Sequence, residues 1–96
     1  VLYGLPWLPH GRRELVAEMA WDPPSLAAGA TTQVNVPLPG ARAGDFAQAG
    51  FSLPTSGLVF LANVGAADVV SVTAWNRSSV QIDLGPGTVR ARVVKA

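Results

Sequence analysis

One histidine, His10, and six acidic residues are the groups in this chain that could transfer a proton. General acid–base catalysis needs such a group within hydrogen-bond reach of the reacting atom. His10 lies in the stretch PHGRR, with no nucleophile or carboxylate directly beside it. We therefore interpret His10 as a solvated histidine of a polar hinge rather than a catalytic base.

The acidic residues are scattered rather than clustered. They are Glu14, Glu18, Asp22, Asp45, Asp68 and Asp83. Three of them stand beside predicted strand ends, where an aspartate commonly accepts hydrogen bonds from loop amides. Their spacing fits neither a calcium loop nor a paired-carboxylate glycosidase site. The two glycine-rich turns lack the lysine and the following helix of a phosphate-binding loop. The sequence predicts no enzyme, no metal and no cofactor.

Arg90 and Arg92 share one face of the last predicted strand, and Trp75 lies on the polar face of an earlier one. If the two strands are neighbours, a guanidinium could stack on the indole. The simpler interpretation is a solvated outer face with one stacking pair, and the alternative is a contact patch for a partner. One tryptophan and two arginines are too few for a groove that binds single-stranded nucleic acid.

The composition points to one small domain that associates with other proteins. The chain has 96 residues, no cysteine and a net charge of +1; charged residues make up 14% and hydrophobic residues 49%. So small a charge does not steer binding to nucleic acid or membrane. A thin core with so few charges leaves apolar surface to be covered by a partner or a symmetry mate. No apolar run is long enough for a transmembrane helix, and no signal peptide is visible.

The elements that must position these residues are predicted to be strands. Residues Val70, Val72 and Ala74, and later Val89, Ala91 and Val93, alternate with mostly polar residues, as one-sided burial of extended chain requires. Turn signals recur about every ten residues, the spacing of a β-sandwich or barrel. We predict an all-β fold: a small antiparallel β-sandwich of six to seven strands, jelly-roll or immunoglobulin-like. The strands are expected at 31–36, 45–53, 58–64, 69–75, 82–84 and 89–94, with a seventh at 16–21. The strand at 58–64 is apolar on both faces except Asn63, which predicts a central, well-covered position.

The first residues, VLYGLPWLP, carry no charge and contain two prolines that forbid a regular helix. We predict an extended apolar arm with a hinge over residues 1–13, followed by the β domain at 14–96. Such an arm either completes its own domain or lies on a partner. Tryptophan and tyrosine favour the second, because they bury much area at low entropic cost. The expected contact residues of the arm are Leu2, Tyr3, Leu5, Trp7 and Leu8.

Short motifs from Trp21 to Val94 resemble a small β-sandwich domain found in structural proteins of tailed bacteriophages. The motifs are Trp21-Asp22-Pro23, Gly40-Ala41, Gly44-Asp45, Ala66-Ala67-Asp68, Asn76, Asp83-Leu84, Gly87-Thr88 and Arg90-Ala91-Arg92-Val93. Each motif is weak alone, and their order and spacing carry the resemblance. It implies a virion component and transfers no catalytic residue, because the matching positions are turn formers and strand residues.

The function expected from this resemblance is capsid decoration. Copies of the chain, most simply trimers, would sit on the outer surface of the phage head and bridge neighbouring major capsid subunits. The alternative is a fibre, spike or tail-associated domain that binds another virion protein or a host glycan, with Trp75 as a stacking platform.

Overall fold

A computed structural model describes residues 14–95, in which β-strands are connected by turns and loops. The arm residues Leu2, Tyr3, Leu5, Trp7 and Leu8, the hinge and His10 lie outside this range. The strands are β1 (Glu14–Trp21), β2 (Thr31–Pro37), β3 (Phe46–Phe51), β4 (Leu58–Ala66), β5 (Val69–Asn76) and β6 (Gly87–Val94). No helix occurs between residues 14 and 95. The all-β prediction is therefore confirmed, and residues 14–21 do form a strand.

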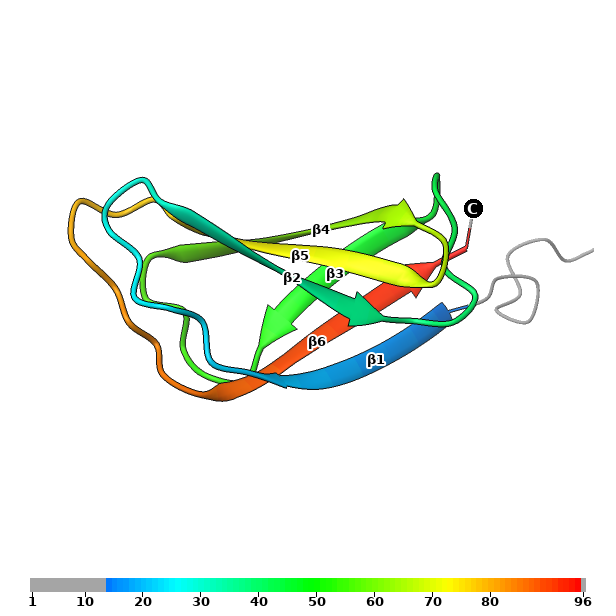
Figure 1. The fold of residues 1–96 in the computed structure, drawn as a ribbon, viewed down its shortest axis with the longest axis horizontal. Coiled ribbons are helices and arrows are strands. Elements are labelled where there is room, and N and C mark those ends of the chain that lie inside the picture. The colour runs from blue at the N-terminus through cyan, green and yellow to red at the C-terminus, as the bar shows by residue number, and fades with distance from the viewer. Residues whose placement is uncertain (1–13, 96) are drawn as a thin grey trace, which may run out of the picture.

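The six strands make two three-stranded antiparallel sheets that face each other (Figure 1). One has the order β1-β6-β3 and the other β2-β5-β4. The predicted inner residues of the two central strands are all fully buried. They are Val70, Val72, Ala74, Val89, Ala91 and Val93, each 0% exposed. The two central strands therefore meet across a common core, as the period of two in the sequence predicts.

The C-terminal half is divided between the two layers, contrary to the simplest expectation from its sequence. β5 pairs with β2 and β4, whereas β6 pairs with β1 and β3. The predicted strand at 82–84 does not form: Ile82 makes only a single bridge, to Leu26. Residues 77–86 instead cross from one sheet to the other. Both hydrogen-bonding edges of β5, and both of β6, are paired with other strands. Each strand can therefore alternate buried and exposed residues although the two are not neighbours.

The prediction that residues 58–64 form a central strand is wrong. β4 lies at the edge of its sheet, with β5 in the middle. Its inner row, which includes Leu58 and Val64, is buried, but Leu61 on the outer face is 51% exposed. The apolar outer residues of β4 are therefore a surface feature and not a second buried face.

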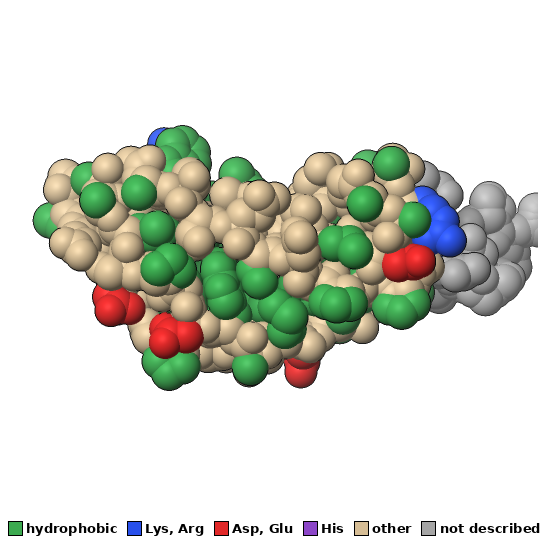
Figure 2. Space-filling model, viewed as in Figure 1, with side chains coloured by type: hydrophobic (Ala, Val, Ile, Leu, Met, Phe, Trp, Pro, Cys, Tyr) green, Lys and Arg blue, Asp and Glu red, His purple; other side chains and the backbone are tan. Residues whose placement is uncertain are grey.

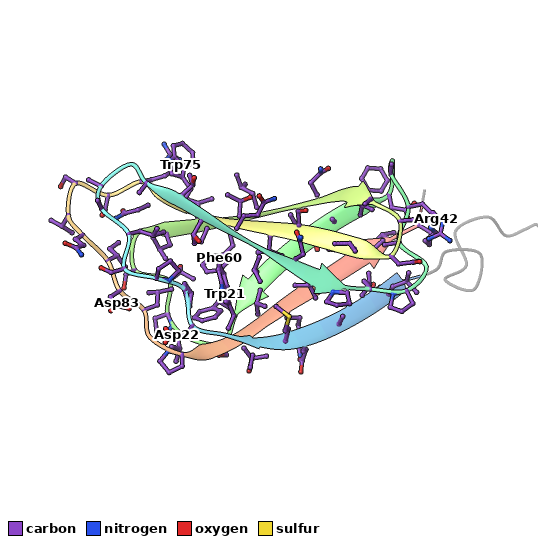
Figure 3. All side chains as sticks on the ribbon, in the orientation of Figure 1. Trp21, Asp22, Arg42, Phe60, Trp75 and Asp83 are labelled. Atoms are coloured by element: carbon purple, nitrogen blue, oxygen red, sulfur yellow. The ribbon has the colours of Figure 1, made fainter. Side chains whose placement is uncertain are left out.

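An aromatic cluster joins the two sheets where β3 leads into β4. The rings of Phe51 on β3 and Phe60 on β4 stack with their centroids 5.4 Å apart. Trp21 at the end of β1 meets both rings edge-on, with centroids 6.4 Å away in each case. Trp21 and Phe60 lie between the layers in Figure 3. Each ring comes from a different strand, so this cluster ties three strands together at one end of the core.

Candidate functional site: an exposed tryptophan patch

Trp75 lies on the outer face of the sheet β2-β5-β4, close to one end of the molecule. Figure 3 shows its side chain pointing away from the core residues Trp21 and Phe60. Antiparallel pairing places Val59 of β4 directly beside Trp75 and Leu61 one diagonal step further. Trp75 is 37% exposed and Leu61 51%. These side chains form an apolar surface on a face that is otherwise polar.

Arg77 completes this surface. Its guanidinium carbon lies 5.1 Å from the centroid of the Trp75 ring, within the range of a cation–π contact. Arg77 follows β5 directly, so the chain turn after Asn76 brings the charge back over the indole. We call Val59, Leu61, Trp75 and Arg77 the Trp75 patch. It combines tryptophan and arginine, the residue types enriched among energetically dominant interface residues.

The condition for Arg90 or Arg92 to stack on Trp75, that their strands are neighbours, is not met. Both arginines lie on β6, which belongs to the other sheet, so the core separates them from Trp75. Arg90 is paired with Glu18, to which its Nε donates at 2.7 Å, and Arg92 lies 2.9 Å from the carboxylate of Glu14. Surface pairs of this kind contribute little to stability. Their charges are satisfied within the domain, which makes these two arginines weaker contact candidates than Arg77.

The outer face of the sheet β1-β6-β3 has a shallow hollow of about 430 Å³. Gly50 provides its floor, because a residue without a side chain leaves space between the neighbouring strands. Its lining includes Thr88, Ser52 and the Arg90–Glu18 pair. The hollow offers hydroxyl groups and a neutralised ion pair, but no arrangement of nucleophile and base.

A fully buried asparagine supports the Trp75 patch from beneath. Asn76 is 0% exposed. Its amide nitrogen donates to the carbonyl oxygens of Leu26 at 2.9 Å and Val80 at 2.8 Å, and its Oδ1 accepts from the amide and hydroxyl of Ser78 at 2.9 and 2.7 Å. These four bonds use the full hydrogen-bonding capacity of one side chain. They hold the loops on either side of the patch to the end of β5.

At the opposite end of the molecule, two aspartates organise the turns, as their positions beside strand ends predict. Asp68 accepts from the amide of Gly40 at 2.8 Å and from the Arg42 guanidinium at 2.7 Å. Asp45 accepts from the amide of Arg42 at 3.0 Å and from Lys95 at 2.5 Å. Figure 3 places Arg42 far from Trp75. This cluster closes the connections between strands and is separate from the Trp75 patch.

Asp68 gives a pH-dependent contribution to stability. The bond from the Gly40 amide, and then that from Arg42, lower the pKa of its carboxyl group below the usual 3.8. The ionised form is therefore favoured by folding, and its contribution is complete above the unfolded pKa and lost as the pH falls through the lower folded pKa. Asp68 also has a positive φ of 65°, a conformation that asparagine tolerates as well.

We therefore expect Asp68→Asn to unfold at a lower temperature than the unchanged protein at pH 7, with the difference shrinking below about pH 4. Thermal unfolding monitored by circular dichroism at pH 7 and pH 3 measures this difference. An equal difference at both pH values would contradict the role of the ionised carboxylate.

Residues 14–95 hold no group of three or more histidine, cysteine or acidic side chains placed to ligate a metal. They also include no helix long and apolar enough to cross a membrane. Large apolar side chains are also exposed at Val16, Phe46 and Val80, by 53%, 69% and 61%, but the Trp75 patch joins an exposed tryptophan, aliphatic side chains and an arginine.

Sequence reasoning identified Trp75 but missed its three companions. Val59 and Leu61 belong to the strand predicted to be covered on both faces, and Arg77 follows the strand that carries Trp75. The sequence of residues 58–64 contains one indication of the patch: a strand that is apolar on both faces must expose one apolar face if it lies at the edge of a sheet. The sequence did not reveal which strand lay at the edge.

A scan of family models, a search of curated proteins and a search of solved structures found no match to this chain.

Proposed function

We propose that this chain is a non-enzymatic structural protein that binds other protein subunits through apolar surface. The observation that carries the proposal is the Trp75 patch: an exposed tryptophan with an arginine on its ring, flanked by Val59 and Leu61. A small domain rarely leaves such residues together on a sheet face without a partner to cover them. The outer face of the other sheet also exposes Phe46 and Val16, at 69% and 53%, but its arginines Arg90 and Arg92 are paired with glutamates.

The resemblance of residues 21–94 to phage structural domains suggests that the particle to which this chain binds is a phage virion. The proposed role is that of a decoration protein on the outside of a phage head, where it bridges major capsid subunits, most simply as a trimer. Many weak contacts repeated over a lattice add up to a large total binding energy without any chemistry. The arm at residues 1–9 provides the attachment, and the Trp75 patch provides a second contact on the folded domain.

The proposed fold within the two-sheet arrangement is immunoglobulin-like. The sheet β2-β5-β4 has the order of strands B, E and D of that fold, and β6-β3 has the order of F and C. The first strand, β1, then takes the place next to F that the last strand occupies in immunoglobulin domains. The order of connections supports this topology over a jelly roll, which has eight strands.

The alternative is a fibre, spike or tail-associated domain in which Trp75 is a stacking platform for a host glycan. The observation that favours it is the exposed indole itself, since sugar rings stack on flat aromatic side chains. The shallow hollow on the opposite face adds hydroxyl groups but no aromatic ring that faces outwards over it.

Two variants distinguish these functions when tested with particles whose genome encodes the chain. Deletion of residues 1–13 should abolish binding to heads that lack the protein, while the circular dichroism spectrum of the β domain stays unchanged. Trp75→Ala should weaken head binding about tenfold or more, as the loss of an interface tryptophan commonly does. Thr73→Ala, the next outer residue of β5, is the matched control and should bind normally.

Undiminished head binding by the deletion variant would overturn the decoration role. A Trp75→Ala protein that leaves head stability intact but abolishes adsorption to host cells would favour the fibre or spike role instead.

A further inference from the structure

The side of the molecule between β1 and β2 is open. These strands belong to different sheets and are not paired with each other. Most inward-facing residues along this side are only half-buried, although they pack against the core; Val36 near the end of β2 is buried, with 1% exposed. Those that are half-buried include Leu15, Ala17, Met19 and Val34. Figure 2, which looks onto this side, shows hydrophobic side chains gathered in a strip between the two layers. We call this feature the open strip.

The opposite side of the molecule is closed. There β3 and β4 are joined by the connection at 52–57, and the stacked rings of Phe51 and Phe60 fill the space between the layers. Ala47, Ala49 and Ala62 on that side are half-buried as well, but their side chains are small. The open side leaves the larger side chains of Leu15, Met19 and Val34 half-buried. The open strip is therefore the place where an added extended segment would bury the most apolar area.

Among the four edge strands, β2 is best suited to accept such a segment. Glu14 and Glu18 place charges on β1, and β4 has an irregularity between Asn63 and Ala66; both features discourage strand addition. β3 lies on the closed side. β2 has neither a charged residue nor a bulge, and its only proline, Pro37, is the last residue. Its free edge runs directly beside the open strip.

We propose that residues 1–9 of a second copy of this chain add to the free edge of β2 and cover the open strip. This inference rests on the proposed function: Tyr3, Leu5 and Trp7 hold a neighbouring copy, and Leu2 and Leu8 on the other face of the arm are left for the capsid subunit. The segment VLYGLPWLP is uncharged, like the strip, and its nine residues are enough to pair along the seven residues of β2. Strand addition supplies main-chain hydrogen bonds for affinity, and alternate side chains supply specificity.

The spacing of residues in the arm fits this arrangement. In a strand, alternate residues direct their backbone groups to one neighbour and their side chains to one face. Tyr3, Leu5 and Trp7 share one such set with Val1 and Pro9, and the other set consists of Leu2, Gly4, Pro6 and Leu8. Pro9 is the last residue of the segment, where its missing N–H interrupts the pairing least. With the first set directed at β2, the large side chains cover the strip. Pro6, which has no N–H to donate, then faces solvent, where proline is tolerated on an edge.

A second copy suits the site better than the arm of the same chain. Residue 13 enters β1, whereas the receiving strand lies in the other sheet. An arm folding back would have to reverse and change layers within residues 10–13. A chain reversal made within four residues brings its two ends to within about 7 Å of each other, whereas facing sheets lie about 10 Å apart. An arm from another copy has neither constraint, and such head-to-tail exchange can close into a ring.

Cysteine crosslinking tests the arrangement cleanly, because the full chain contains no cysteine. A Leu5→Cys protein is mixed with a differently tagged Thr32→Cys protein and oxidised. Thr32 is half-buried on the strip side of β2, and Thr31 is exposed on its other face. We expect a disulfide between the two differently tagged chains with Thr32→Cys and its loss with the control Thr31→Cys. A second control, Leu8→Cys in place of Leu5→Cys, should also lose the product.

Two results would overturn the inference. The first is a disulfide that forms only within one chain, in the double variant Leu5→Cys/Thr32→Cys, which would place the arm on its own domain. The second is the absence of a crosslink in every combination while each variant melts as the unchanged protein does. Sedimentation of Leu5→Asp should show loss of the oligomer, and Leu8→Asp should retain it. Binding to phage heads is measured separately, so failure of this docking mode is distinguishable from failure of the proposed function.

Discussion

Asn76→Ala is expected to lower the free energy of unfolding by about 3 kcal/mol, because it removes a buried, fully bonded side chain. The amide of Ser78 would lose its acceptor, and the carbonyl groups of Leu26 and Val80 would each lose a donor. The Leu26 carbonyl keeps the bond from the Ile82 amide, and the Ser78 hydroxyl, released from Asn76, can donate its one proton to the Val80 carbonyl. The free energy of unfolding therefore falls by less than it would if all four partners of Asn76 were left without a hydrogen bond. Urea unfolding at pH 7 measures it.

The matched control for this prediction is Asn63→Ala. Asn63 lies on the exposed face of β4, and its replacement should change stability by less than about 0.5 kcal/mol. If the two variants were equally stable, the hydrogen bonds of Asn76 would not contribute to the stability of the domain. Asn76→Ala should also weaken partner binding, since the loops that Asn76 holds flank the Trp75 patch.

Phe60→Ala is expected to destabilise the domain by about 3 kcal/mol, the lower end of the range for aromatic truncation in a core. Phe60 is only partly buried, which places it at that lower end. Its ring stacks on Phe51 of the other sheet and meets the edge of Trp21, so its loss removes two of the three ring contacts and leaves only that between Trp21 and Phe51. Aromatic pairs contribute beyond the area they bury. Thermal and urea unfolding both report the change.

The neighbouring residue provides the control. Leu61→Ala, on the outer face of the same strand, should cost less than about 1 kcal/mol because the side chain is already half exposed. Its larger effect should be on partner binding, as a member of the Trp75 patch. A Phe60→Ala protein as stable as Leu61→Ala would mean that the aromatic cluster does not hold the two sheets together.

The sequence indicates single residues of the candidate site but not which residues lie beside them. Trp75 stood out because a large aromatic occupied the polar face of a predicted strand. The open strip could not be foreseen, since it depends on which two strands end their sheets. The role of Asn76 was equally hidden: its partners Leu26 and Val80 approach it through loops whose paths are set by the sheets.

By itself, the sequence determined the class, most of the strands and their buried faces. Val70, Val72 and Ala74 lie inward, as do Val89, Ala91 and Val93, because a period of two decides the buried side of a strand locally. Only the tertiary structure decided the neighbours. It places β5 and β6 in different sheets and β4 at an edge. It also brings Arg77 over the Trp75 ring and pairs Arg90 with Glu18. Arg92 is paired with Glu14. Strand pairing is a choice between distant segments with similar hydrogen-bonding edges, and local alternation does not encode that choice.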